Sequence, residues 1–236
     1  MKKLAIGLLA VAAVMSVQTS KAQTADEVID KYVAAMGGRE KLLLLKSVKL
    51  TGSLNVQGMD VGITITAVNV VGTRTDISVP GMGEGFQIMN ATKGWNFMPF
   101  QGQATPAEVS ADQVKASQSQ LDIQGPLLNY KEKGSQVELA GREKIDGKDA
   151  YKIKLTNKAG KVITYFIDAT TFYRVKSIGK TQTPEGETDA ETSYSDFKKT
   201  ADGFIFPFSQ TNARGTIVFT EIEVNKPVDE KIFTAE

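Results

Sequence analysis

Cysteine and histidine are both absent from this sequence of 236 residues, and tryptophan occurs only once, at Trp95. Without histidine, the chain lacks the most common general base, the most common zinc ligand and every nucleophile system that pairs serine or cysteine with histidine. Any catalysis would have to rely on carboxylates or lysines. Without cysteine, no disulfide can form, so a large apolar core must stabilise the fold.

Long hydrophobic runs are scarce as well. The run in residues 4–14 follows two lysines and precedes the small-residue pattern Ser20-Lys21-Ala22, which predicts a secretory signal peptide over residues 1–22. It is shorter than the roughly 20 apolar residues of a membrane span. We therefore expect residues 23–236 to form a single exported domain without a transmembrane segment. Because a bacterial lipoprotein carries its lipid on a cysteine, we expect a periplasmic protein that is not a lipoprotein.

Charge of neither sign predominates. Without the three lysines of residues 1–22, the chain has 25 basic and 27 acidic residues, so no basic excess suggests nucleic acid as a partner. The acidic segments "REKIDGKDAY" and "TPEGETDAETSYSD" are rich in turn residues, and lysines are interspersed. This pattern favours solvated charges over a catalytic carboxylate pair.

Sequence motifs of enzymes are missing too. The chain has no phosphate-binding loop, dinucleotide fingerprint, calcium loop or nucleophile elbow. We expect no enzyme, no cofactor and no metal, and a carboxylate hydrolase ranks last among the alternatives.

The segment "TADEVIDKYVAAMGG" predicts an amphipathic helix. Thr24 and Glu27 have the spacing of a capping box, apolar residues recur at helical spacing, and Gly37-Gly38 ends the pattern. The segment "REKLLLLKS" then predicts a second short helix or a turn.

From Ser47 onwards, apolar residues alternate with polar ones, which predicts antiparallel strands joined by turns. The alternation stops between Pro106 and about Tyr130, where "TPAE" and "SADQ" predict one or two short helices. A sheet of roughly ten or eleven strands accumulates twist and curls. The sequence therefore predicts an α+β fold, in which a curled antiparallel sheet forms an incomplete β-barrel and helices plug its concave side.

The segment "GWNFMPFQGQ" carries apolar residues on both faces of any strand. Trp95 and Phe97 point one way, while Met98 and Phe100 point the other way. We expect the first pair to face the concave side, together with residues of the preceding strand. Flexible methionines and aromatic rings suit a pocket for variable apolar groups, although the same residues also occur as ordinary core. The candidate ligand-binding residues at the cavity or its mouth are Met82, Phe86, Ile88, Trp95 and Phe97.

Five segments carry a family likeness: "ADEVIDKYVAAMGGREKL", "GWNFMPFQGQATPAEVS", "YFIDATTFYRVK", "YSDFKKTADGFIFPF" and "TIVFTEIEVNKPVDEKIF". Together they resemble the LolA/LolB-like outer-membrane lipoprotein-sorting proteins, particularly their exported relatives in Bacteroidetes. The resemblance implies a half-barrel of about eleven strands with a helical lid and an apolar cavity that holds lipoprotein acyl chains.

Two functions follow as hypotheses. The first is a non-enzymatic periplasmic carrier of a hydrophobic ligand, either lipid or acylated protein, in an apolar half-barrel cavity. The second is an interaction module that docks on an envelope protein through an outer apolar patch and holds no cavity ligand.

Overall fold

The computed structural model describes residues 23–183 and 186–235 of the chain. The predicted signal peptide lies outside the described residues. The helices are α1 (Ala25–Ala35), α2 (Arg39–Leu43) and α3 (Ala111–Ser117), and the 3-10 turns are η1 (Pro99–Gln101), η2 (Gln118–Leu121) and η3 (Glu230–Phe233). The strands are β1 (Ser47–Val56), β2 (Met59–Val68), β3 (Gly72–Val79), β4 (Gly83–Asn90), β5 (Gly94–Phe97), β6 (Ala107–Glu108), β7 (Gln136–Ile145), β8 (Lys148–Thr156), β9 (Val162–Asp168), β10 (Arg174–Thr183), β11 (Gly186–Lys199), β12 (Ile205–Asn212) and β13 (Gly215–Val224).

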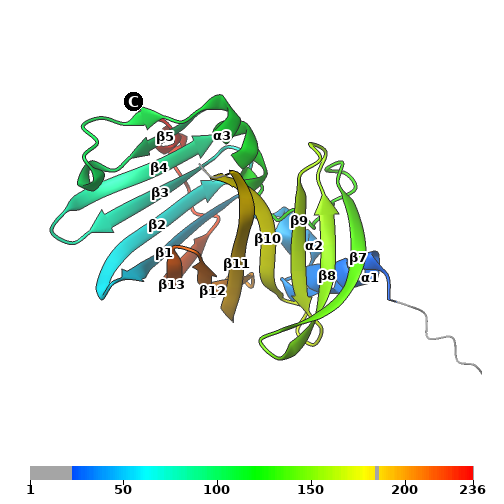
Figure 1. The fold of residues 1–236 in the computed structure, drawn as a ribbon. Helices are drawn as coiled ribbons and strands as arrows, with labels where there is room; N and C mark the ends of the chain where they lie inside the picture. The colour runs from blue at the N-terminus through cyan, green and yellow to red at the C-terminus, as the bar shows by residue number, and fades with distance from the viewer. Residues whose placement is uncertain (1–22, 184–185, 236) are drawn as a thin grey trace, which may run out of the picture.

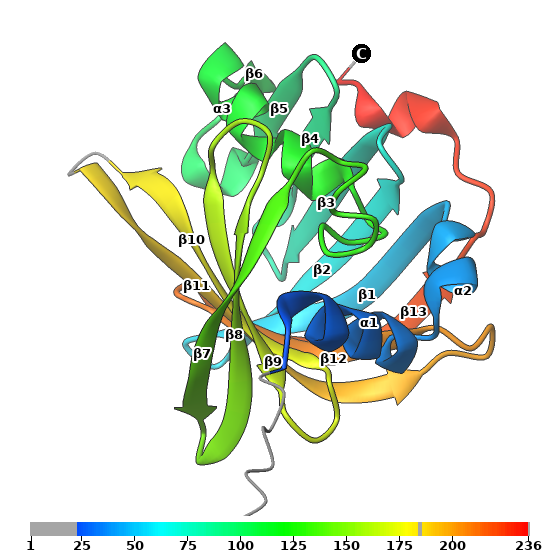
Figure 2. The same ribbon diagram turned by 90° about the vertical axis from the view of Figure 1, so that its right-hand side faces the viewer.

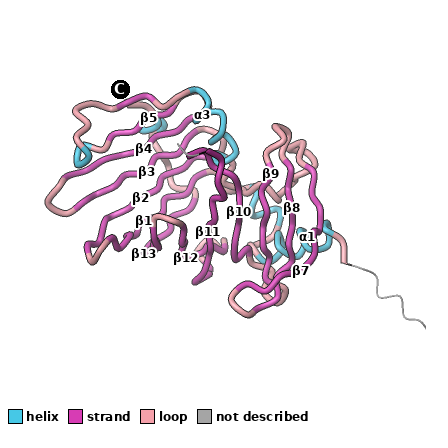
Figure 3. The backbone as a smooth tube through the Cα atoms, viewed as in Figure 1, coloured by secondary structure: helices cyan, strands magenta, loops and turns pink. Residues whose placement is uncertain are grey.

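The strands form one antiparallel sheet in the order β6-β5-β4-β3-β2-β1-β13-β12-β11-β10-β9-β8-β7 (Figure 1, Figure 3). Nearly all neighbours in the sheet are also neighbours in sequence, as in a meander. The exception is the pairing of β1 with β13, where Val48 lies opposite Val224. Because β6 and β7 are separate edges, the described sheet curls without closing, which confirms the predicted incomplete barrel.

The sheet has 13 strands, two more than the largest number we expected. One addition is β6, which lies where "TPAE" predicted a helix. Ala107 and Glu108 pair instead with Asn96 and Trp95 on β5, since an adjacent strand edge supplies hydrogen bonds that an isolated helical turn lacks. The capping box predicted from "SADQ" does form, between Ser110 and Gln113, and begins α3.

Helix α1 lies in the hollow of the sheet (Figure 2). Its predicted capping box is present, since the Thr24 hydroxyl accepts a hydrogen bond from the Glu27 amide and the Glu27 carboxylate accepts one from the Thr24 amide. The apolar side of the helix is buried, with Val28 fully inaccessible and Ile29 4% exposed. The predicted plug of the concave side is therefore confirmed.

The core lies on the concave side of the sheet, which we define as the face that α1 covers. One cluster joins α1 to β8 and β9 through residues such as Val28, Ile153 and Ile167. A second cluster is built around Val48, Leu50, Ala67 and Phe219 on β1, β2 and β13. The two clusters share Ile123, Phe206 and Ile222, so the apolar surface runs continuously across the interior.

No helix among the described residues is long and apolar enough to cross a membrane.

Candidate functional site

The concave face of β1, β2, β12 and β13 carries large apolar side chains that are only partly buried. Ile65 lies opposite Leu50 in the register of β1 and β2, and Ile217 lies opposite Leu54. Ile65, Ile217 and Phe208 are half-buried and pack against the second core cluster. Full burial of a Leu, Ile or Phe side chain contributes about 1.5–3 kcal/mol. The interior therefore retains apolar surface that a ligand can cover.

The interior is covered by α1 and by the segment 121–132 that follows α3. Tyr130 donates a hydrogen bond to Asp26 of α1, and Lys131 forms an ion pair with the same carboxylate at 2.9 Å. These two hydrogen bonds lower the pKa of Asp26 below its ordinary value. Arg39 of α2 forms a second link, an ion pair with Glu132 at 3.3 Å. Both links are exposed and contribute little, so the cover is held mainly by its buried apolar side chains, which include Val28, Leu127 and Leu128.

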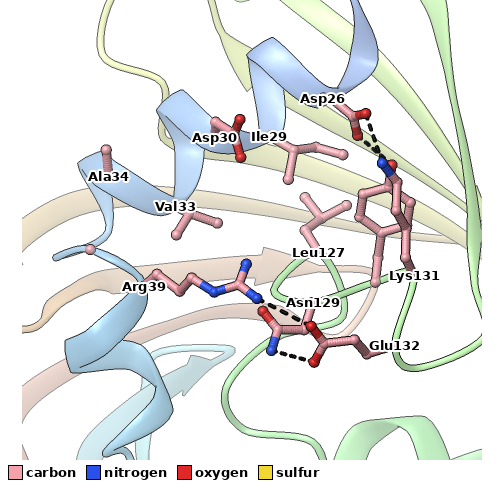
Figure 4. Close-up of a pocket in the computed structure, with 12 residues that line it drawn as sticks. Asp26, Ile29, Asp30, Val33, Ala34, Arg39, Leu127, Asn129, Lys131 and Glu132 are labelled. Carbon is pink, nitrogen blue, oxygen red and sulfur yellow. Dashed lines mark hydrogen bonds and ion pairs between the residues drawn. The ribbon is translucent and has the colours of Figure 1, made fainter.

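A groove of about 520 Å³ lies between α1 and the segment 127–132 (Figure 4). Its floor is apolar and includes Ile29, Val33 and Leu127, while charged residues of α1, α2 and the segment form its rim. The Asn129 side chain donates to Glu132 at 2.8 Å, and its buried Oδ1 accepts no hydrogen bond. The groove thus combines an apolar floor with a charged rim between α1 and the segment 127–132.

Further inside, the side chain of Arg174 lies among aromatic rings. Its Cζ atom is 4.4 Å from the centroid of the Tyr194 ring and 5.6 Å from that of Tyr165. Tyr32 of α1 interacts electrostatically with the same guanidinium group. The Tyr194 hydroxyl and the Ser177 hydroxyl form a hydrogen bond of 3.1 Å. The site combines one cation with three phenol rings on the apolar concave face.

Four of the five predicted site residues do share one face of the sheet. Phe86 lies opposite Phe97, with ring centroids 5.5 Å apart, and Ile88 lies opposite Trp95. Ile88 is 2% exposed, and the other three are half-buried. Met82 is separate from them, since it lies at the β3–β4 turn with 55% of its surface exposed.

This shared face is the convex side, opposite to the side we expected. Arg74 and Asp76 continue the face onto β3, with Arg74 stacked on Phe86 at 4.6 Å. Ala67 and Ile65 of the second core cluster lie opposite Thr73 and Thr75, so the core is on the other face of β3. A groove of about 440 Å³ on the convex side includes Arg74, Phe86 and Phe97 in its lining. Whether these residues bind a ligand stays a prediction.

The reason for the reversal lies in the residues that follow β5. The chain turns back, so Met98 is 6% exposed. A Cβ atom placed on Gly85 would lie 2.9 Å from the Phe100 ring and 3.1 Å from the Met98 sulfur. Gly85 pairs with Ile77 and shares its concave face. Met98 and Phe100 therefore occupy the inner side of β4 and leave Trp95 and Phe97 outside.

The acidic segments form ion pairs with lysines at their surface. The pairs are Lys152–Glu143 at 3.3 Å, Lys144–Asp149 at 3.0 Å, Lys176–Glu191 at 2.6 Å, Lys180–Asp189 at 2.8 Å and Lys198–Asp196 at 2.7 Å. Within the described ranges, no three acidic side chains cluster in a way that would hold a metal ion. These pairs agree with the interpretation of both segments as solvated charge.

Sequence reasoning missed Arg174. The segment "FYRVKS" has no motif, and the strand is irregular there, with a register shift between Arg174 and Lys176 against β9. Its aromatic neighbours come from the flanking strands β9 and β11 and from α1, which is far from Arg174 in sequence. The only available signal was a single arginine in an otherwise alternating strand.

No known family model matches the sequence, and no curated protein matches it. Solved structures do match over nearly the whole chain. A LolA superfamily protein from Nitrosomonas europaea has a TM-score of 0.55 and 16% identity, with 90% of this chain and 98% of that chain covered. A DUF1329 family protein from Desulfovibrio piger has a TM-score of 0.55 and 12% identity, with coverages of 89% and 96%.

A third structure is a Vibrio parahaemolyticus domain named for outer membrane lipoprotein sorting. Its TM-score is 0.51 at 12% identity, and 88% of this chain and 94% of that chain are covered. At such identities the likeness concerns the fold. The chain has a LolA-like fold, as the resemblance of its sequence predicted.

Proposed function

We propose that this protein is a non-enzymatic periplasmic carrier that binds lipid or lipoprotein acyl chains on the concave side of its half-barrel. The observation that carries the proposal is the set of half-buried apolar side chains on the concave face, including Ile65, Phe208 and Ile217. These side chains lie under a cover of helices and loop. The predicted export signal and the LolA-like fold support the same function.

The cover explains how a ligand enters. A carrier must expose its apolar site to load and shield it in transit. Here, α1 and the segment 121–132 are joined by exposed side-chain contacts such as Asp26 with Lys131 and Arg39 with Glu132. Breaking these ion pairs costs little, but opening the cover also exposes buried apolar side chains such as Val28 and Leu127. A bound acyl chain would cover this surface again, and no strand needs to unpair.

Two neighbouring residues on β13 provide the test. Ile217 faces the interior, whereas Val218 lies opposite Ser53 on the convex side and is 49% exposed. The uncharged fluorescent probe 1-N-phenylnaphthylamine should bind the protein saturably and be displaced by lipid. Ile217→Asn places an amide on the apolar surface and should weaken binding by about 10-fold.

The matched variant Val218→Asn should bind the probe like the original protein. Native mass spectrometry of the protein purified from a periplasm should also detect bound lipid. Absence of both co-purified lipid and displaceable probe binding would contradict the carrier proposal.

A second candidate is a module that docks on an envelope protein. The observation that favours it is the convex groove lined by Phe86 and Phe97, on the same face of the sheet as Trp95, where aromatic rings lie outside the core. Aromatic residues with an adjacent arginine, here Arg74, are enriched at protein interfaces. This candidate places the functional surface on the opposite side of the same strands.

A further inference from the structure

Within the part of the chain that the structure describes, Arg174 is a cation without an ionic or hydrogen-bond partner inside the half-barrel. Among the described residues, its guanidinium group forms no hydrogen bond or ion pair, and it contacts aromatic rings instead. The surrounding tyrosines do not neutralise it, because burial raises the pKa of both Tyr32 and Tyr165 and keeps their hydroxyls uncharged. Asp122, the acid that interacts electrostatically with these tyrosines, is already paired with Lys133 at 2.6 Å.

An unpaired cation in an apolar site is unfavourable, and contact with tyrosine rings offsets only part of the cost. A fold therefore gains little from this arginine unless something else pairs with it. Arg142 shows how an arginine with a structural role is arranged in the same protein. It stacks on Tyr151 at 4.4 Å and also donates a 2.7 Å hydrogen bond to the Tyr151 hydroxyl.

The unused donors of Arg174 remain accessible. The buried side-chain atoms without a partner in the described chain are Asn96 Oδ1 and Asn129 Oδ1, and no guanidinium nitrogen is among them. Arg174 is half-buried and its unpartnered N–H groups are not fully covered, so a ligand on the concave side can hydrogen-bond to them. A guanidinium group presents its donors in a planar fork that fits a carboxylate or a phosphate with two parallel hydrogen bonds.

We infer that Arg174 binds the anionic head of an amphiphile whose apolar chain lies on the concave face. The inference rests on the carrier function proposed above and specifies its ligand as a carboxylate or phosphate amphiphile. The Tyr194 ring contacts the guanidinium group, and its hydroxyl forms a 3.1 Å hydrogen bond with Ser177; this pair leaves one O–H free to donate to the same head. The apolar residues Phe206 and Ile222, which both core clusters share, continue the surface away from this site.

The test compares two probes that differ only in charge: 11-(dansylamino)undecanoic acid and its methyl ester. The original protein should bind the acid at least about 10-fold more tightly than the ester, because a hydrogen bond to a charged group contributes about 1.5–3 kcal/mol. Arg174→Gln should remove this preference while retaining ester binding, which also shows that the variant is folded. Arg174→Lys keeps the charge but loses the fork, and should retain only part of the preference.

Arg142→Gln is the matched control and should keep the full preference for the acid. Equal binding of acid and ester by the original protein would overturn the inference and leave the carrier function standing. Failure of both probes to bind would overturn the carrier function itself. Inorganic phosphate that displaced the acid at equal concentration would also overturn the inference, since the apolar chain would then contribute nothing.

Discussion

Trp95 lies on the convex face of the sheet and can serve as a fluorescent probe of that face. It lies opposite Ile88 in register, its ring is 5.9 Å from the Lys93 ammonium group, and it shares the convex face with Phe86 and Phe97. Half-burial at a polar edge suits an indole, whose ring is apolar and whose N–H group needs a partner. As the single tryptophan of the chain, it allows the two functional hypotheses to be separated by fluorescence.

We expect the emission of Trp95 to stay constant when palmitate loads the interior, because the strands separate the indole from the concave face. Docking of a protein on the convex groove should shift the emission of Trp95. Trp95→Ala should reduce the free energy of unfolding by about 1–2 kcal/mol, since only part of the ring is buried. Phe219→Ala, at a core position that is 2% exposed, should cost about 3–5 kcal/mol. A palmitate-dependent emission shift would contradict the placement of Trp95 outside the ligand site.

Helix α1 is the element that separates the interior from solvent at one end. It packs through Val28 and Ile29 on the first core cluster, and Asp26 in its first turn holds the segment 127–132 through Tyr130 and Lys131. The pKa of Asp26 is lowered by these hydrogen bonds, so the carboxylate is the form that makes the link. The strength of the cover therefore depends on a titratable group.

A group whose pKa is lower in the folded state contributes stability above its unfolded value of about 3.9 and loses that contribution as the pH falls through the folded value. We expect the amides of α1 to lose protection against hydrogen exchange when the pH drops below about 4. Asp26→Asn should produce the same loss at neutral pH.

Asp30→Asn is the matched control for α1. Asp30 lies on the same helix and lines the same groove, but it forms no hydrogen bond or ion pair within the described ranges. Its variant should therefore keep the original protection factors. Equal protection of α1 in Asp26→Asn and in the unchanged protein would show that the link does not hold the cover.

The two halves of the sheet meet where β1 pairs with β13, the contact between the most distant strands in sequence. The register shifts between Thr51 and Gly52, and the backbones approach closely at this irregularity. A Cβ atom on Gly52 would lie 2.2 Å from the Val218 carbonyl oxygen and 2.8 Å from the Phe219 Cα atom. Only glycine fits this approach, so one residue allows the sheet to curl as a continuous surface.

We expect Gly52→Ala to lower the urea midpoint of unfolding, with a loss of about 1–3 kcal/mol or more from overpacking against the backbone. Gly179→Ala on β10 is the control, because its Cβ atom would have the Ile163 side chain as its nearest neighbour at 3.9 Å. That variant should be neutral or slightly stabilising. Equal urea midpoints for the two variants would contradict the role of Gly52 in the close pairing of β1 with β13.

Local features of the sequence were sufficient for most elements, although not for β6, which forms where a helix was predicted. The spacing of Thr24 and Glu27 determines the start of α1, and the alternation around Val48 and Leu50 determines a strand with one apolar face. Alternation also determined that Phe86 and Phe97 share a face. These features depend on neighbours within a few residues, and the LolA-like fold follows from their order along the chain.

Only the tertiary structure decided which face is the interior and what lies in it. The alternation of segment 94–103 places apolar residues on both faces, and the turn after β5 that brings Met98 and Phe100 against Gly85 determines that Trp95 lies outside. The surroundings of Arg174 depend on rings from the flanking strands β9 and β11 and on Tyr32 of α1, which reaches them only when the helix packs into the hollow of the sheet. A period of two specifies that side chains alternate between faces, but only long-range packing specifies which face is buried.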